Sequence, residues 1–209
     1  MHGSRGGLMS ERTDTSADVI IDVVLDLLES EGYEAVQVRT VARRARKSLA
    51  TLYELFGTRD QLILAAVERW MATNAYAGLT MPQPDESPYE TMVRILRTVF
   101  EPWERHPRML EAYYRARGGP GGVRLVLQGM TIVRPIVAAA LPDADPEYLR
   151  DVEMIHEHVT RAAIARFAEG EIAVTDILPI LERALLRLTM DNRLGTARPS
   201  LRAVDGRRR

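Results

Sequence analysis

The most informative absences in this 209-residue sequence are those of cysteine, of long apolar runs and of a large net charge. Without cysteine the chain can form no disulfide bridge, no thiolate metal site and no cysteine nucleophile. It has no signal-peptide pattern and no uninterrupted run of about 18 apolar residues, so we expect a cytoplasmic protein without a membrane partner. A net charge of −1 gives no overall attraction to nucleic acid, so such binding would depend on a local basic patch.

The residues that are present are typical of a globular helical protein. Hydrophobic residues make up 46% of the chain and charged residues 27%, a composition that supports one sizeable core or two modest ones. Near the N-terminus, apolar residues recur at helical spacing: Ile20, Val23, Val24, Leu27 and Leu28. The periodicity predicts an all-α fold, with helices over 15–31, 58–78, 89–105, 107–117, 123–141, 146–169 and 174–191.

Residues 39–56 concentrate positive charge. Five of the nine residues from 39 to 47 are basic and none is acidic. We interpret the segment as a helix-turn-helix, with a supporting helix, a tight turn at residues 46–48 and a short second helix. This density of charge suits neutralisation of phosphates, and the second helix is compact enough to enter a major groove. The alternative is a solvated charged face beside an ordinary amphipathic helix.

From residue 19 to about residue 64 the sequence resembles the DNA-binding domain of the tetracycline-repressor (TetR) family. The matching positions are Glu31, Gly32, Tyr33, Val38, Val41, Ala42, Ala45, Ser48, the run TLYELF at 51–56 and the run TRDQL at 58–62. The chain departs from the family pattern at Arg46, where the family places Gly, and at Lys47, where Val is common. It departs again at Gln37, where Thr or Ser is usual.

This resemblance implies two domains: an N-terminal three-helix helix-turn-helix DNA-binding domain and a C-terminal helical ligand-binding and dimerisation domain. We place the first at residues 15–60 and the second at 61–192. Residues 1–14 and a basic tail at 193–209 are predicted to be disordered. The helix that begins near Thr58 would link the two domains and transmit a ligand signal.

The resemblance also implies which residues meet DNA. They are Arg39, Lys47, Leu49, Ala50, Thr51, Tyr53 and Arg59, with Lys47 a candidate that the family itself does not supply. Leu49 and Ala50 carry no donors, so they would contact thymine methyl groups from the head of the recognition helix. Arg39 would bind a guanine edge or a phosphate, and the remaining residues would bind phosphates.

Aromatic and methionine residues gather in the middle of the second domain. They can form a packed core, in which Met fills irregular gaps, or the apolar walls of a ligand pocket, as the family resemblance implies. The predicted pocket residues are Trp103, Met109, Tyr113, Tyr114, Met130 and Val133. Residues 32–41 and the polar spacing near Tyr113 also resemble actinobacterial repressors of steroid and lipid catabolism, which implies an apolar or acyl-CoA-type effector.

The last two helices carry broad apolar faces. The family pairs these helices with their copies in a four-helix dimer interface; the alternative is that they only close their own domain. The predicted interface residues of a homodimer are Val159, Ala163, Ile177, Ile180, Leu181 and Leu185.

Catalytic and metal sites are less well supported. His156 and His158 lie two apart on a helix and point to different faces, so they cannot chelate one ion locally, and we expect no metal or cofactor. An all-helical enzyme using His156 with Glu153 or Glu157 is the competing class, but the sequence supplies no positioned nucleophile or cofactor fingerprint. We therefore predict a non-enzymatic repressor that binds a palindromic DNA operator as a dimer and responds to a small-molecule effector. The alternative is a DNA-binding regulator without a ligand.

Overall fold

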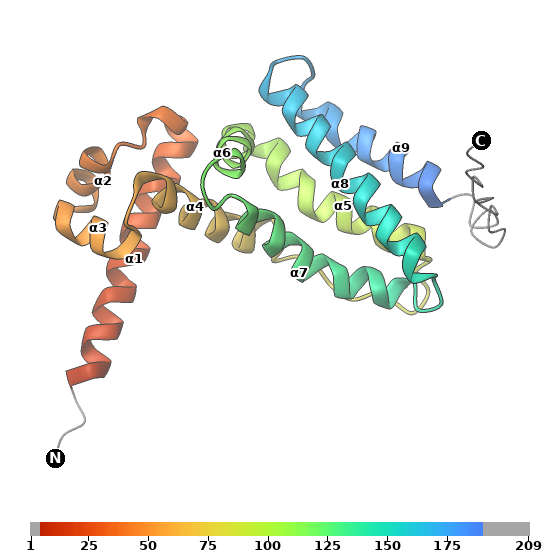
Figure 1. The fold of residues 1–209 in the computed structure, drawn as a ribbon, viewed down its shortest axis with the longest axis horizontal. Coiled ribbons are helices and arrows are strands. Elements are labelled where there is room, and N and C mark those ends of the chain that lie inside the picture. Colours follow the sequence, from red (N-terminus) through yellow and green to blue (C-terminus); the bar gives the residue numbers. More distant parts are fainter. Residues whose placement is uncertain (1–4, 190–209) are drawn as a thin grey trace, which may run out of the picture.

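The computed structural model describes residues 5–189, with the backbone alone for residues 5–14. Every regular element in that range is helical, which confirms the predicted all-α fold (Figure 1). The α-helices are α1 (Arg5–Ser30), α2 (Val38–Ala45), α3 (Leu49–Phe56), α4 (Arg59–Trp70), α5 (Pro88–Arg105), α6 (Pro107–Gly118), α7 (Val123–Ala140), α8 (Pro146–Ala168) and α9 (Ile177–Thr189). Three short segments are the 3-10 helices η1 (Tyr33–Ala35) and η3 (Val174–Asp176) and the π-helix η2 (Met71–Ala75). The predicted basic tail at 193–209 lies outside the described residues.

Helix α1 differs from the prediction at its beginning. We predicted disorder over residues 1–14, whereas the helix begins at Arg5. No proline interrupts this stretch, and each residue added to an existing helix gains a backbone hydrogen bond, so the helix extends beyond its apolar stripe. The stripe itself is confirmed, because Ile20, Val24, Leu27 and Leu28 are fully buried.

Helices α1 to α3 form a small N-terminal head. Val36, Val41 and Leu52 are buried with the α1 stripe in one hydrophobic cluster. α2 and α3 pack on each other, and α2 packs on α1, as a three-helix DNA-binding domain requires (Figure 1). The short helices can therefore hold their geometry although neither is long enough to be stable alone.

Helix α4 carries the chain from the head into the second domain. It continues as the π-helix η2, in which the Tyr76 amide donates to the Met71 carbonyl at 3.0 Å. The Thr73 hydroxyl and the Asn74 side-chain amide donate to the carbonyls of Arg69 and Trp70, both at 3.0 Å. These bonds satisfy backbone groups at the transition, and π-helical segments of this kind are frequent at functional sites.

Helices α5 to α9 form the second domain, and their bounds fall close to those predicted (Figure 1). α7 continues through Pro135 as one helix, so no new helix begins there. By length and composition alone α7 would also qualify as a membrane span. In this fold its two arginines pair with neighbouring helices, Arg124 with Glu68 and Arg134 with Glu153, so α7 is a wall of the helical bundle.

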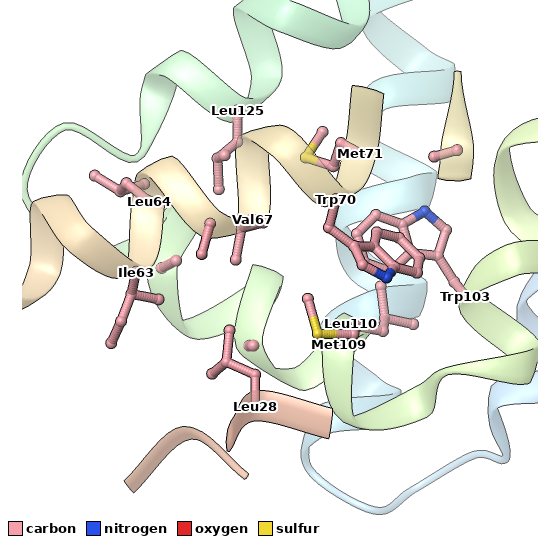
Figure 2. Packing of buried hydrophobic residues seen from close by; sticks show 14 of the residues in the cluster. Leu28, Ile63, Leu64, Val67, Trp70, Met71, Trp103, Met109, Leu110 and Leu125 are labelled. Carbon is pink, nitrogen blue, oxygen red and sulfur yellow. The ribbon is translucent and has the colours of Figure 1, made fainter. Parts of the chain in front are cut away.

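One continuous core joins the head to the bundle, centred on α4 and α6. Leu28, Ile63, Val67 and Met109 belong to it together with Leu125 of α7 (Figure 2). At the end of α4 the rings of Trp70 and Trp103 lie with their centroids 4.2 Å apart. The head and the bundle are therefore packed against each other through shared apolar side chains.

Candidate functional site

The turn between α2 and α3 is built from local interactions. Arg46 adopts the left-handed conformation, with φ 53° and ψ 41°. This is the position at which the TetR-family pattern has Gly. The Lys47 amide donates to the Ala42 carbonyl at 3.0 Å, which closes the end of α2. Ser48 then caps α3, because its hydroxyl accepts from the Thr51 amide at 3.0 Å. The turn therefore keeps helix-turn-helix geometry without glycine.

Helix α3 presents an unpartnered face to solvent. Leu49 is 40% exposed and Tyr53 54% exposed, while Leu52 is buried at 1% and anchors the helix. Ala50 is exposed beside Leu49. An eight-residue helix is about 12 Å long, comparable with the width of a B-DNA major groove, also about 12 Å. Large side chains left exposed on so short a helix are suited to contacts with base edges.

Unpaired positive charge lies beside this face on α2 and the turn. In the described part of the chain Arg39, Arg43 and Arg46 are exposed and have no hydrogen bond or ion pair through their side chains. Arg44 instead pairs with Glu31 at 2.5 Å and with Asp26 at 3.8 Å. The free guanidinium groups are the ones available to phosphates.

Two of the predicted DNA-contacting cations have partners within the protein. The Lys47 amine donates to the Ser16 hydroxyl at 2.9 Å and so ties the turn to α1. Arg59 donates to the carbonyls of Val36 at 2.5 Å and Tyr33 at 2.8 Å, and its guanidinium lies 4.8 Å from the centre of the Tyr33 ring. In this conformation the donors of Arg59 hold the loop between α1 and α2, and its contact with a phosphate stays a prediction.

The bundle encloses a cavity of about 310 Å³ between α5, α6, α7 and α8. Every α5 side chain that lines it is apolar or aromatic: Met92, Ile95, Leu96, Val99, Phe100 and Trp103. Met71 and Tyr76, at the end of the helix that leaves the head, also line it. The cavity and the head are therefore connected through one segment of chain.

Four of the six predicted pocket residues line this cavity: Trp103, Tyr113, Met130 and Val133. Met109 and Tyr114 do not. Leu110, Tyr113 and Arg117 occupy the cavity-facing stripe of α6, three and four residues apart, so Met109 is rotated away and is fully buried in the core beside α4 (Figure 2). Of the α5 residues that line the cavity, only Trp103 was predicted. An apolar stripe at helical spacing looks the same in the sequence whether it packs in a core or lines a cavity.

The polar residues of the cavity come mainly from α6 and α8. Arg117 pairs with Glu157 at 2.6 Å, and Thr160 lies one turn further along α8. His156 lines the cavity, and burial lowers the pKa of its imidazole below the usual 6.5. Burial also raises the pKa of the Tyr76 and Tyr113 hydroxyls, so all three groups are neutral at physiological pH. Among the described residues no cluster of three His, Cys, Asp or Glu side chains could hold a metal ion.

The predicted dimer residues divide into two groups. Ala163, Ile177, Leu181 and Leu185 are buried within their own subunit, so their place in a dimer interface stays a prediction that this burial does not favour. They lie on the stripes with which α8 and α9 close their own domain. Val159 and Ile180 remain partly exposed. Ile155, at 41% exposure one turn before Val159, and the exposed Ala162 extend this surface along α8.

Comparisons with known proteins identify both domains. Residues 20–66 match the family model described as bacterial regulatory proteins of the tetR family, and residues 86–188 match the tetracyclin repressor-like C-terminal domain. The HTH-type transcriptional repressor KstR of Rhodococcus jostii is 29% identical over 183 residues, covering 86% of this chain and 84% of that protein. KstR of Mycolicibacterium smegmatis is 32% identical over 117 residues, covering 54% of this chain and 55% of that protein.

Solved structures share the fold. A TetR transcriptional regulator from Rhodococcus sp. RHA1 has a TM-score of 0.66 at 19% identity and covers 86% of this chain and 97% of that chain. A TetR-family regulator from Streptomyces coelicolor, SCO0253, has a TM-score of 0.53 at 20% identity, covering 91% and 97%. At these identities the structural likeness bears on the fold alone.

Proposed function

This chain belongs to the TetR family of transcriptional regulators, and we propose that it is a repressor that binds a palindromic operator as a homodimer and releases it when a small-molecule effector binds. The observation that carries the proposal is the exposed face of α3 beside unpaired arginines of α2. A protein of this kind works in the cytoplasm, where the chromosome is accessible.

On the operator, α3 would enter the major groove. Leu49 and Ala50 would contact thymine methyl groups, since neither side chain can donate a hydrogen bond. The hydroxyls of Thr51 and Tyr53 would donate hydrogen bonds to phosphates. Arg43 and Arg46 would neutralise the charge of phosphates nearby. Lys47 already donates one of its three ammonium hydrogens to Ser16, so we assign it a smaller share of the phosphate binding. Two copies of the head on a two-fold axis would then read two inverted half-sites.

Arg39 provides the test of this arrangement. Operator fragments would first be selected from the source genome, and the binding of the Arg39→Ala variant then measured on the operator and on a scrambled duplex. If Arg39 reads a base, we expect a loss of about 1–3 kcal/mol on the operator and much less on the scrambled duplex. Equal losses on both would make it a phosphate contact.

Arg44→Ala is the matched control, because Arg44 lies on the same helix but is already paired with Glu31 and Asp26. We expect it to change operator affinity by less than Arg39→Ala does. If the wild-type protein preferred no duplex over scrambled DNA at moderate salt, the proposed function would be wrong.

The cavity supports an effector over regulation without a ligand. Its volume of about 310 Å³ lies within the range of small-molecule sites, and its lining is mainly apolar. A second hollow of about 330 Å³ between α7 and α8 shares Met130, Arg134, Glu153 and Glu157 with it and adds Arg150. An acyl chain in the cavity with an anionic group near Arg134 and Arg150 would fit this shape, so we propose an apolar or acyl-CoA-type effector.

The homodimer would use the outward face of α8 and α9. Ile155 and Ala162 on α8 are exposed, and Val159 on α8 and Ile180 on α9 remain partly exposed while they pack against the subunit's own core. Alanine at position 162 would let a helix of the second subunit approach closely.

A further inference from the structure

Two buried polar atoms beside the cavity have no hydrogen-bond partner among the residues that the structure describes. They are Nε of Arg117 on α6 and Nε2 of His156 on α8, and both residues line the cavity. A buried polar atom left without a partner costs roughly 1–3 kcal/mol, and such atoms are uncommon in native proteins. Because both residues line one cavity, a molecule bound there is in a position to supply the missing partner.

The charge around these atoms is largely balanced. A terminal nitrogen of Arg117 lies 2.6 Å from Glu157, and Arg134 lies 2.6 Å from Glu153. An anionic group placed beside Arg117 would also stand close to the Glu157 carboxylate, and like charges repel strongly where water is excluded. The free Nε–H of Arg117 is therefore better suited to a neutral oxygen than to a carboxylate.

His156 is compatible with the same partner. Its neutral imidazole can present Nε2 as a donor or as an acceptor, depending on the tautomer. A carbonyl oxygen can accept from both Arg117 and His156, whereas a hydroxyl can accept from Arg117 and donate to His156. Neither atom reaches solvent in this conformation, so a modest change of side-chain torsion must accompany the contact.

The remaining lining of the cavity determines the chemical character of the rest of the ligand. The α5 lining is apolar or aromatic throughout, and α7 adds Val126, Met130, Val133 and Val137. We infer that the cavity binds an elongated apolar molecule whose neutral carbonyl or hydroxyl oxygen is held by Arg117 Nε and His156 Nε2. This inference rests on the proposed function, in which the cavity is the effector site.

Two variants remove the polar atoms with little other change. Arg117→Lys keeps a cation that can reach Glu157 but places a methylene where Nε stood. His156→Phe removes Nε2 and keeps a planar ring. The probes are 2-dodecanone and 1-dodecanol, each with one neutral oxygen, dodecanoate with a charged one, and hexylbenzene with none. Their dissociation constants would be measured by calorimetry or equilibrium dialysis at neutral pH, with thermal melting of the unliganded proteins.

We expect the wild-type protein to bind the ketone and the alcohol more tightly than dodecanoate. Each variant should weaken ketone binding about tenfold and leave hexylbenzene binding unchanged, as expected for the loss of one hydrogen bond to a charged or buried donor. The unliganded variants should melt no lower than the wild type, because an unsatisfied atom has been removed. A purely structural role would lower the melting temperature and leave the preference among ligands unchanged.

Three results would overturn the inference. Unchanged ketone and alcohol affinity in both variants, or a wild-type preference for dodecanoate, would disprove the neutral-oxygen site while leaving the cavity an effector site. Failure of the wild-type protein to bind any of the four probes would count against both the inference and the proposed effector, whereas operator binding would be unaffected.

Discussion

Arg46 is the residue at which the helix-turn-helix carries backbone strain. It is the one non-glycine residue in the described chain with a positive φ, 53°. A side chain in this conformation costs about 1–2 kcal/mol, and glycine would remove that cost while adding conformational freedom to the unfolded chain. We expect Arg46→Gly to raise the free energy of unfolding by up to about 1 kcal/mol, measured by urea denaturation.

The same substitution separates stability from DNA binding. Arg46 is exposed and unpaired, so losing its charge should weaken binding to operator and scrambled DNA alike and reduce the salt dependence. Arg43→Gly is the control, since a glycine inside α2 should destabilise the head by about 1 kcal/mol. A loss of stability in Arg46→Gly would contradict the left-handed turn described above.

His156 gives the protein a specific response to acid. Burial lowers the pKa of its imidazole below 6.5, so between 6.5 and the lower folded value the unfolded chain binds more protons than the native protein. Stability due to this group is fully present above pH 6.5 and is lost as the pH falls through the folded pKa. We expect the unfolding free energy of the wild type to fall more steeply from about pH 7 to about pH 5 than that of His156→Gln. Parallel profiles would show that the imidazole titrates as in the unfolded chain.

At the scale of elements, the sequence was sufficient to predict where the helices lie in the chain. It was not sufficient to predict what each helix face packs against. The stripe of α1 and the serine that begins α3 depend on neighbours within one turn, so spacing and capping chemistry reveal them. Met109 and Leu110 are adjacent, yet one packs in the core and the other lines the cavity, a difference set by where α4 and α8 lie. The apolar stripe of Leu181 and Leu185 is a similar case, since spacing alone does not say whether a helix of the same subunit or of a second subunit covers it; in this structure the same subunit covers it.

The family pattern also did not predict the hydrogen bonds that side chains make to the loop between α1 and α2. Gln37 stands at the N-cap position of α2, but its side chain accepts no hydrogen bond from the helix. Instead, its side-chain amide donates to the Glu34 carbonyl at 3.0 Å. Arg59 matches a family position, but its partners Tyr33 and Val36 lie more than twenty residues earlier in the chain. The motif gave the position correctly, and the tertiary contacts decided what the side chain does there.

Besides the segment that carries Met71 and Tyr76, helix α7 offers a second route from the cavity to the head. Arg124, in the first turn of α7, pairs with Glu68 and donates to the side-chain oxygen of Gln61 at 2.9 Å. The side-chain amide of Gln128 donates to the backbone carbonyl of Glu68 at 3.0 Å. Glu68 and Gln61 belong to α4, which packs against α1 and α3. A ligand that moves α7 would therefore move α4.

The coupling between effector and operator should depend on this contact. We expect palmitoyl-CoA to weaken operator binding by the wild type, and Arg124→Met to reduce that effect by about 0.5–2 kcal/mol without losing ligand affinity. Fluorescence anisotropy of the operator with and without ligand measures it. Arg97→Met is the control, because Arg97 pairs with Glu182 of α9 and is not among the residues that line the cavity. Equal reductions in both variants would mean that the coupling does not pass through α7.

For the whole molecule, the proposed function requires two heads at a fixed separation, and that separation depends on the interface behind them. The part of α8 and α9 that a second subunit can reach includes Ile155 and Ile180, whereas Leu181 and Leu185 are covered by the subunit itself. A charge at Leu185 would unfold the domain and would say nothing of the interface. The informative substitutions are therefore the outward ones.

We expect Ile155→Glu combined with Ile180→Glu to give a folded monomer, because two carboxylates on each copy would have to be buried against the other. Operator affinity should fall by a factor on the order of 10² or more, since each head would then bind its half-site without the benefit of the second. Sedimentation velocity measures the mass and circular dichroism the fold. Leu127→Glu is the control: Leu127 is 53% exposed on α7, which is not part of the proposed interface, and its replacement should leave both mass and affinity unchanged. A double variant that sediments as a dimer would move the interface elsewhere, and a loss of dimer in Leu127→Glu would move it to α7.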